Sequence, residues 1–283
     1  MTRVVLWGTR GSIAAPGPDT ARYGGNTSCV EVQGDEGTIL LLDAGTGLRR
    51  LGASLPRGLR RVDVLLTHLH MDHIQGLGFF APLHDPHVEV HIWGPASVTQ
   101  SLYARLTRYL SPPIFPVRLR DLPRLPVLHE VPAARCDIGE FCVSTCLVCH
   151  PDPTVGYRIE AADGVIAYLP DHEPALGAKK FPLSRQWTSG YTLAAQADML
   201  LHDTQYTLAE YAARVGWGHS ALEHSFAFAA LAEVKRLVPF HHDPAHSDDD
   251  LDRLYAQAVA TLKPPFNVTP AMEGAVLELG GGR

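Results

Sequence analysis

Four side chains of types that bind metal ions fall within six residues of this sequence. They are His68, His70, Asp72 and His73, in the stretch THLHMDH that begins at Thr67. Imidazole nitrogens combined with a carboxylate oxygen suit zinc, manganese or iron. On an extended loop His68 and His70 point the same way, while Asp72 and His73 lie past a bend and can turn to a second ion. Packing does not require this spacing, so the stretch predicts a metal centre.

The elements around this stretch place it at the end of a strand. Residues 62–66 (VDVLL) have the pattern of a short buried strand. Other histidines and aspartates also follow strand-like runs, namely Asp43, His150, Asp171, Asp203, His241 and His242. Active sites of layered folds gather at one edge of the sheets. We therefore expect these side chains to converge on the histidine loop.

The order of the expected elements indicates an α/β fold. Strands are expected over residues 3–8, 28–33, 38–43, 62–67, 88–93, 140–149, 154–161, 164–169, 198–203, 236–240 and 274–279. Helices are expected over residues 71–82, 95–109, 191–197, 205–214, 220–236 and 247–262. Strands come in runs with helices between the runs, which predicts two facing sheets with helices outside. No internal repeat or linker is evident, so we expect a single domain over residues 1–283.

The composition is that of an ordinary globular protein, with 46% hydrophobic and 19% charged residues. The net charge of −6 argues against a general nucleic-acid or anionic-membrane surface. No apolar run approaches the roughly 18 residues of a membrane span. The first eight residues lack the apolar core of a signal peptide, so we expect a cytoplasmic protein with no membrane partner.

The five cysteines are an odd number without an export signal, which argues against a disulfide framework. Cys142, Cys146 and Cys149 have the spacing of the iron–sulfur ligands in radical-SAM enzymes. Residues 141–148, however, have the pattern of a strand, which would place Cys149 on the opposite face from the other two. We therefore expect buried cysteines that pack as small hydrophobic residues.

Residues 110–135 are rich in proline and arginine. The prolines are Pro112, Pro113, Pro116, Pro123, Pro126 and Pro132, and the arginines are Arg118, Arg120, Arg124 and Arg135. The simpler interpretation is a solvated surface excursion. The functional alternative is a lid or rim whose arginines meet a substrate anion.

The motif His68-x-His70-x-Asp72-His73, with Asp43, His150, Asp171 and His241 in this order, resembles the metallo-β-lactamase fold hydrolases over nearly the whole chain. Residues 7–12 (WGTRGS) and 24–28 (GGNTS) resemble the opening of the phosphodiesterase branch, which includes tRNase Z and the phosphoribosyl cyclic phosphate phosphodiesterase. Residues 218–221 (GHSA) are similar to a Gly-His-Ser-Thr segment of tRNase Z. The resemblance implies a four-layer αββα sandwich of two mixed sheets.

The resemblance also implies two divalent ions, with zinc expected and manganese as the alternative. One ion would be held by His68, His70 and His150. The other would be held by Asp72, His73 and His241, with Asp171 bridging the pair. His242 is a rival to His241, which we prefer. His172 and His246 are expected beside the site or on the surface, and Asp43 is expected to fix the tautomer of a ligand imidazole.

The expected catalytic residues are His219, Asp203 and the ligand Asp72. Two divalent ions lower the pKa of a bound water to about 7 and so supply hydroxide at neutral pH. His219 is the candidate proton donor to the leaving alkoxide, and Asp203 resembles its carboxylate partner in tRNase Z. The alternative for His219 is a helix-start residue with no chemistry.

These residues predict a dinuclear-metal phosphodiesterase that cleaves a small or cyclic phosphodiester with a metal-bound hydroxide. A tRNase Z-like endoribonuclease is an alternative, but the acidic charge and the lack of a Lys/Gly-rich arm make nucleic acid an unlikely partner. Hydrolysis of a lactone or thioester at the same site is a further alternative. A non-enzymatic binding protein is disfavoured because every ligand position is filled. A homodimer is compatible with the resemblance, and the substrate and the metal stay open.

Overall fold

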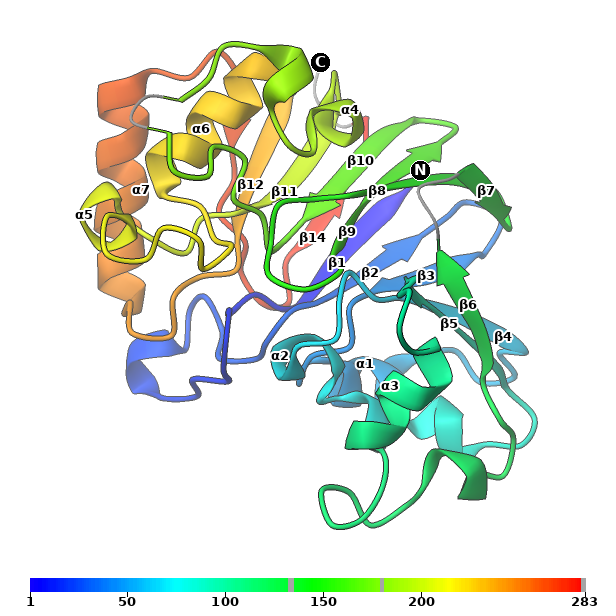
Figure 1. Cartoon of the computed structure of the whole chain (residues 1–283). Coiled ribbons are helices and arrows are strands. Elements are labelled where there is room, and N and C mark those ends of the chain that lie inside the picture. Colours follow the sequence, from blue (N-terminus) through cyan, green and yellow to red (C-terminus); the bar gives the residue numbers. More distant parts are fainter. Residues whose placement is uncertain (132–134, 179–180, 281–283) are drawn as a thin grey trace.

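Two seven-stranded mixed sheets face each other in the computed structural model, which describes residues 1–131, 135–178 and 181–280 (Figure 1). The first sheet has the order β14 (Val276–Glu278), β1 (Arg3–Gly8), β2 (Cys29–Gln33), β3 (Ile39–Leu42), β4 (Arg61–Leu65), β5 (Glu89–Pro95), β6 (Val127–Val131). The second has the order β13 (Asn267–Val268), β12 (Arg236–Phe240), β11 (Met199–Asp203), β10 (Gly164–Leu169), β9 (Val155–Ala161), β8 (Phe141–Leu147), β7 (Arg135–Ile138).

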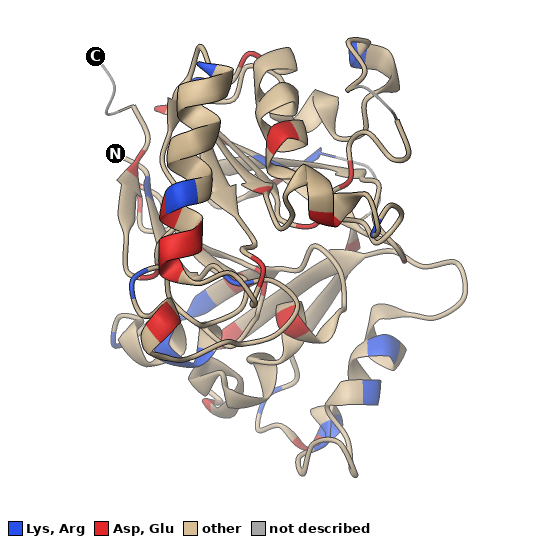
Figure 2. Cartoon of the chain, turned by 90° about the vertical axis from the view of Figure 1, so that its left-hand side faces the viewer, with Lys and Arg blue, Asp and Glu red and all other residues tan. Residues whose placement is uncertain are grey.

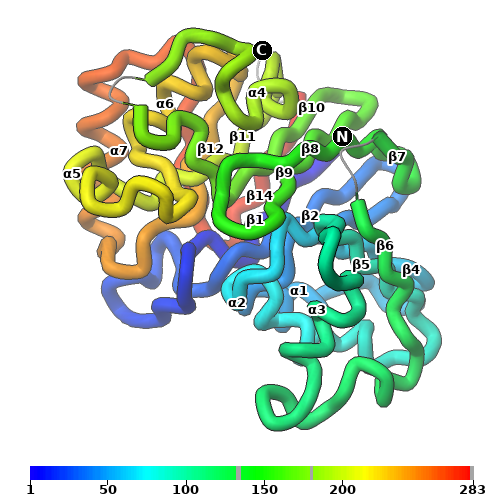
Figure 3. The backbone as a smooth tube through the Cα atoms, in the orientation of Figure 1, coloured from blue at the N-terminus to red at the C-terminus, as the bar shows by residue number. Residues whose placement is uncertain are grey.

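Helices cover the outer face of each sheet, as the tube drawing also shows (Figures 1 and 3). The first sheet carries α1 (Leu48–Ser54), α2 (Met71–Ile74) and α3 (Leu102–Tyr109). The second carries α4 (Tyr191–Ala194), α6 (Leu222–Leu231) and α7 (Asp248–Leu262), while the short α5 (Leu208–Tyr211) lies at the end of the molecule near α7. Three apolar clusters fill the three spaces between the four layers. The predicted αββα sandwich is confirmed.

One edge of the sandwich collects the carboxyl ends of strands from both sheets. In the first sheet β3, β4, β5 and β6 are parallel neighbours. In the second, β10, β11 and β12 are parallel, and β8 runs the same way because both β8 and β10 are antiparallel to β9. Loops that follow β3, β4, β8, β10, β11 and β12 therefore open at the same edge.

Several elements differ from the sequence-based expectation. The helix expected over residues 71–82 is divided into α2 and two 3-10 turns, Leu77–Phe79 and Ala81–His84, because Gly76, Gly78 and Pro82 interrupt it. The helix expected over 95–109 begins only after Ser101, whose side chain caps it. The strands β6, β7 and β13 and the helix α1 had no counterpart among the expected elements.

Residues 110–126 pack on the outer side of the first sheet and lead from α3 into β6. The arginines of the region 110–135 are all paired with carboxylates around them. The pairs are Arg118 and Arg120 with Asp121, Arg124 with Glu89, and Arg135 with Glu160. These pairs favour the surface interpretation, and the lid stays a prediction. Pro132 lies outside the described residues.

The cysteines are less buried than expected. Cys142 and Cys146 do lie on one face of β8, with Cys149 beyond its end. All three are half-buried, so the prediction that they are buried is wrong for this trio. Cys142 and Cys146 lie on the face of β8 that is only partly covered, and β8 is next to the short edge strand β7.

Residues of both charge signs are spread along the chain, and acidic residues gather where α7 begins (Figure 2). Asp248, Asp249 and Asp250 occupy the first turn of α7, and Ser247 caps it in a capping box with Asp250. Among the described helices, none has the length and apolar character that crossing a membrane requires. The cytoplasmic location stays a prediction.

Candidate metal centre

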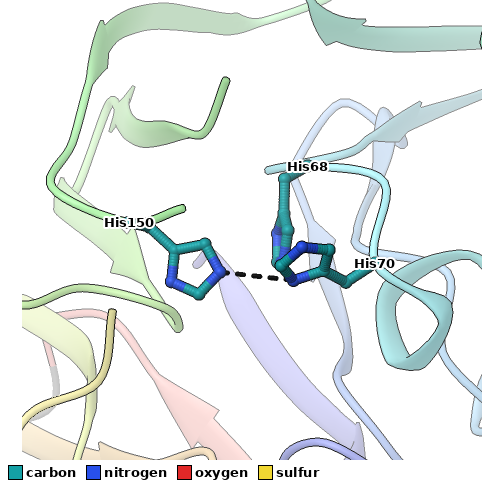
Figure 4. A group of neighbouring side chains, drawn as sticks. All are labelled: His68, His70 and His150. Carbon is teal, nitrogen blue, oxygen red and sulfur yellow. Dashed lines mark hydrogen bonds between the residues drawn. The ribbon is translucent and has the colours of Figure 1, made fainter. Parts of the chain in front are cut away.

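Three histidines from two loops converge at the common edge of the sheets. His68 and His70 come from the loop after β4, and His150 comes from the loop after β8 (Figure 4). One nitrogen from each ring lies within 4.8 Å of the other two. Nε2 of His150 is 3.3 Å from Nδ1 of His70, and the ring centroids of His68 and His150 are 4.7 Å apart. The three predicted ligands of the first ion are therefore brought together.

A second group of four side chains adjoins the first. Asp72 and His73 lie within α2, Asp171 follows β10, and His241 follows β12. Oδ2 of Asp72 is 3.2 Å from Nε2 of His73 and 3.3 Å from Nε2 of His241. All four are buried. This is the set predicted for the second ion, together with its bridging carboxylate.

Asp171 faces both groups with different oxygens. Its Oδ2 is 3.0 Å from Nε2 of His73 and 3.2 Å from Nε2 of His241. Its Oδ1 is 3.9 Å from Nε2 of His68 and 3.8 Å from Nε2 of His150. Burial by itself raises the pKa of Asp171, but the surrounding histidines hold it well below its usual value. The carboxylate is therefore ionised and lies between the two groups.

Oxygen acceptors on the far side of the rings orient three of these histidines. Carbonyl and carboxylate oxygens only accept hydrogen bonds, so each Nδ1 carries the proton and each Nε2 directs its lone pair into the centre. The acceptors are Asp43 for His73 at 2.7 Å, Gln205 for His241 at 2.9 Å, and the Gly218 carbonyl for His150 at 2.9 Å. This is the usual support of metal-binding imidazoles.

The buried polar atoms fit divalent cations. Nε2 of His68, Nε2 of His73 and Oδ2 of Asp171 are buried and have no hydrogen-bond partner. Unpaired buried polar atoms are costly, and here the segments that follow β4 and β10 bring them close together. Asp43 and His241 also have left-handed backbones, with φ of 58° and 60°. Such strain at non-glycine residues is typical of functional sites.

His242, the rival of His241, is turned into the protein interior. Its Nε2 is 2.9 Å from the Ala271 carbonyl and its Nδ1 is 2.8 Å from the Tyr255 hydroxyl. Both nitrogens are thus engaged away from the centre. Two other histidines also lie outside it, since His246 contacts Glu210 at 3.0 Å and His172 contacts His202 at 2.9 Å.

His219 and Asp203 form a pair beside both metal-ligand groups. Nδ1 of His219 is 2.7 Å from Oδ2 of Asp203, and its ring stacks on His241 with centroids 5.1 Å apart. Burial lowers the pKa of His219, but the charge and hydrogen bond of Asp203 raise it to about 9. Burial in turn raises the pKa of Asp203. Asp203 occupies Nδ1, which leaves Nε2 of His219 as the nitrogen available to a substrate.

Gly11 and Ser12, in the N-terminal segment WGTRGS, contact two residues of the metal centre. Gln205, which the sequence reasoning missed, lies beside them. The backbone N–H of Ser12 donates to Oδ2 of Asp72 at 2.8 Å. A Cβ on Gly11 would lie 2.4 Å from Nδ1 of His241, so only glycine fits there. Gln205 links this segment to His241, because its side-chain amide donates to Ser12 Oγ at 3.1 Å. The position of Gln205, two residues after Asp203, was its only sequence signal.

Comparisons with known proteins agree with this architecture. A family model described as a Beta-lactamase superfamily domain matches residues 38–242. Ribonuclease BN of Cronobacter sakazakii is 25% identical over 271 residues, which cover 81% of this chain and 86% of the relative.

Two solved structures show the same fold over 98% of this chain. The metallo-beta-lactamase fold protein YhfI from Bacillus subtilis has a TM-score of 0.71 at 18% identity, and all of that chain is covered. A diphosphatase from the PhnP family has a TM-score of 0.68 at 17% identity, with 96% of that chain covered.

The chain belongs to the beta-lactamase superfamily, since the family model spans most of it. The predictions of a metallo-β-lactamase fold and of a hydrolase are confirmed. The fold and the His/Asp cluster together imply divalent metal ions. The prediction that nucleic acid is an unlikely partner gains no support, because the relative from Cronobacter sakazakii is a ribonuclease.

Proposed function

We propose that this protein is a cytoplasmic dinuclear-metal phosphodiesterase that acts on a small or cyclic phosphodiester. The observation that carries the proposal is the position of Asp171, whose two oxygens face two separate groups of ligands. The pair of His219 and Asp203 beside these groups adds a proton donor.

Seven side chains would hold the two ions, with zinc expected and manganese as the alternative. The first ion would be held by His68, His70 and His150, the second by Asp72, His73 and His241, with Asp171 shared. When bound, two such ions lower the pKa of a water molecule and neutralise charge on a phosphoryl oxygen.

The remaining residues of the site orient these groups and move a proton. Asp203 accepts a hydrogen bond from Nδ1 of His219 and stabilises the imidazolium form. Nε2 of His219 then donates its proton to the alkoxide oxygen as that oxygen leaves the phosphorus. Asp43 and Gln205 keep His73 and His241 in the tautomer that presents Nε2.

The proposal is tested by hydrolysis of bis-p-nitrophenyl phosphate with metal-loaded protein. We expect turnover in the wild type and its loss in His70→Ala, a change at a side chain that is 43% exposed and leaves little cavity. His246→Ala is the matched control, since His246 lies outside the centre and contacts Glu210. Turnover that persists after chelation of the metal, or in His70→Ala, would contradict the proposal.

A second candidate is an endoribonuclease, which the ribonuclease relative favours. The net charge of −6 and the lack of a Lys/Gly-rich insertion argue against tight RNA binding. A gel shift with tRNA at physiological salt, about 150 mM, distinguishes the two: tight binding and cleavage would favour the nuclease.

A third candidate is hydrolysis of a lactone or thioester, favoured by apolar side chains around the centre. Ile13 is 63% exposed next to Ser12, Met71 is 47% exposed next to Asp72, and Trp217 is 60% exposed two residues before His219. An apolar portion of a substrate would suit this rim. Comparison of lactones, cyclic nucleotides and cyclic phosphoribose on one metal-loaded preparation decides which bond is cleaved.

A further inference from the structure

Glu173 is a buried carboxylate that no cation balances among the described residues. Its side chain is nearly inaccessible to solvent. Its Oε1 accepts from the Tyr211 hydroxyl at 2.6 Å, and its oxygens accept from the backbone N–H of Gly216 at 3.1 Å and of Gly218 at 3.0 Å. Burial of a charge is costly unless it is fully hydrogen-bonded. Here backbone donors of one loop supply much of that compensation.

The loop that Glu173 holds forms part of the metal centre. Gly216 and Gly218 both have left-handed backbones, with φ of 86° and 88°. The carbonyl of Gly218 accepts the hydrogen bond from Nδ1 of His150 at 2.9 Å, and a Cβ on Gly218 would lie 2.2 Å from that nitrogen. His219, the next residue, bonds to Asp203. The shape of this loop therefore sets the position of one metal ligand and of the proton donor.

Glu173 also contacts the loop of His150 through its own backbone. Its N–H donates to the carbonyl of Cys149 at 2.9 Å, directly before His150. Glu173 lies two residues after Asp171, so one short segment connects three loops. These are the loop of the bridging carboxylate, the loop of His150 and the loop of residues 216–219.

We propose that Glu173 is a positioning residue that fixes the tautomer of His150 and the place of His219 by shaping residues 216–218. The inference rests on the proposed metal centre for its functional meaning. Its structural consequence, a proton on Nδ1 of His150, can be tested in metal-free protein. Groups that hydrogen-bond directly to metal ligands typically contribute about 10- to 100-fold to metal affinity or activity. Here that group is the carbonyl of Gly218, which Glu173 positions.

The first experiment measures the tautomer of His150 in metal-free protein. Histidine-labelled protein is examined by long-range ¹H–¹⁵N NMR, with the signals of His150 assigned from their loss in His150→Gln. We expect the Nδ1–H tautomer in the wild type and a mixture of tautomers in Glu173→Gln. Glutamine keeps the size of the side chain but replaces one acceptor oxygen with a donating amide, so the hydroxyl of Tyr211 and the N–H groups of Gly216 and Gly218 are left with one acceptor oxygen instead of two. An unchanged tautomer in Glu173→Gln would overturn the inference.

The second experiment measures binding of cobalt(II) by calorimetry and by its visible absorption spectrum. We expect Glu173→Gln to bind one of two ions about 10- to 100-fold more weakly. Tyr211→Phe is the matched control, because it removes one hydrogen bond to Glu173 and keeps both backbone donors. We expect its affinity and spectrum to stay near those of the wild type, and circular dichroism verifies that each variant is folded.

The two proposals fail in different ways. Wild-type protein that binds no pair of ions contradicts the proposed function, while the NMR result still decides the role of Glu173. Wild-type protein that binds two ions, with Glu173→Gln identical to it in tautomer, affinity and spectrum, overturns only the role of Glu173.

Discussion

Nδ1 of His219 and Oδ2 of Asp203 lie 2.7 Å apart, and the histidine ring stacks on His241 of the metal centre. Asp203 is the last residue of β11, and His219 lies in the loop before α6. The imidazole of His219 therefore lies directly beside the residues expected to bind the second ion. In the proposed function, His219 protonates the leaving group and does not act on the attacking water.

The effect of His219 is expected to depend on the leaving group. For a diester with an alkyl leaving group, His219→Ala should lower kcat by about 100-fold or more, since the alkoxide needs a proton. For a p-nitrophenyl ester the loss should be much smaller, because p-nitrophenolate leaves without protonation. Steady-state kinetics with both substrates measure the difference. Equal losses with the two would indicate that His219 has another role.

Replacement of Asp171 should affect both ions at once. Asp171→Asn removes the shared negative charge, so we expect metal content to fall below two ions per chain and activity to fall by more than about 100-fold. Elemental analysis and activity on the same preparation measure both quantities. A variant that keeps two ions per chain would show that the carboxylate does not bridge them.

Replacement of His241 should affect metal binding, whereas replacement of His242 should affect stability. His241→Ala is expected to lose metal and activity while it stays folded. His242→Ala is expected to lose about 1–3 kcal/mol of stability, because the carbonyl of Ala271 and the hydroxyl of Tyr255 each lose one hydrogen bond, and to keep the metal centre. Urea denaturation and metal analysis of the two variants provide the comparison. Loss of metal in His242→Ala alone would reverse the assignment.

Buried His202 should make the stability of the protein sensitive to acid. Burial lowers its pKa from 6.5 to about 3, so between these values the unfolded chain takes up a proton that the folded chain does not. The contribution of His202 to stability is therefore constant above about pH 6.5, and it falls by roughly 1.4 kcal/mol per pH unit between about pH 6.5 and about pH 3. Urea denaturation at several pH values measures this slope, and His202→Asn should reduce it by the same amount. An unchanged slope in His202→Asn would mean that other groups account for the acid sensitivity.

The sequence predicted the fold class and most strands because apolar runs and their spacing reflect local backbone geometry. It did not predict β6 or β7, which lie in the proline-rich stretch where turn residues dominate the pattern. The helix expected over residues 71–82 was wrong for a related reason, since glycine and proline interrupt it while its apolar spacing persists.

By itself, the sequence determined which residue types are available for metal chemistry, since the His68 motif and the strand-end histidines and aspartates are visible in one dimension. Only the tertiary structure distinguished His241 from His242, because the direction of neighbouring side chains depends on a left-handed bend, with φ of 60° at His241, and on what packs behind each ring. Only the tertiary structure also placed Asp171 between the two groups of ligands and Glu173 against the loop of Gly216 and Gly218. Such contacts join residues far apart in the chain, and their geometry arises from how two sheets meet at one edge.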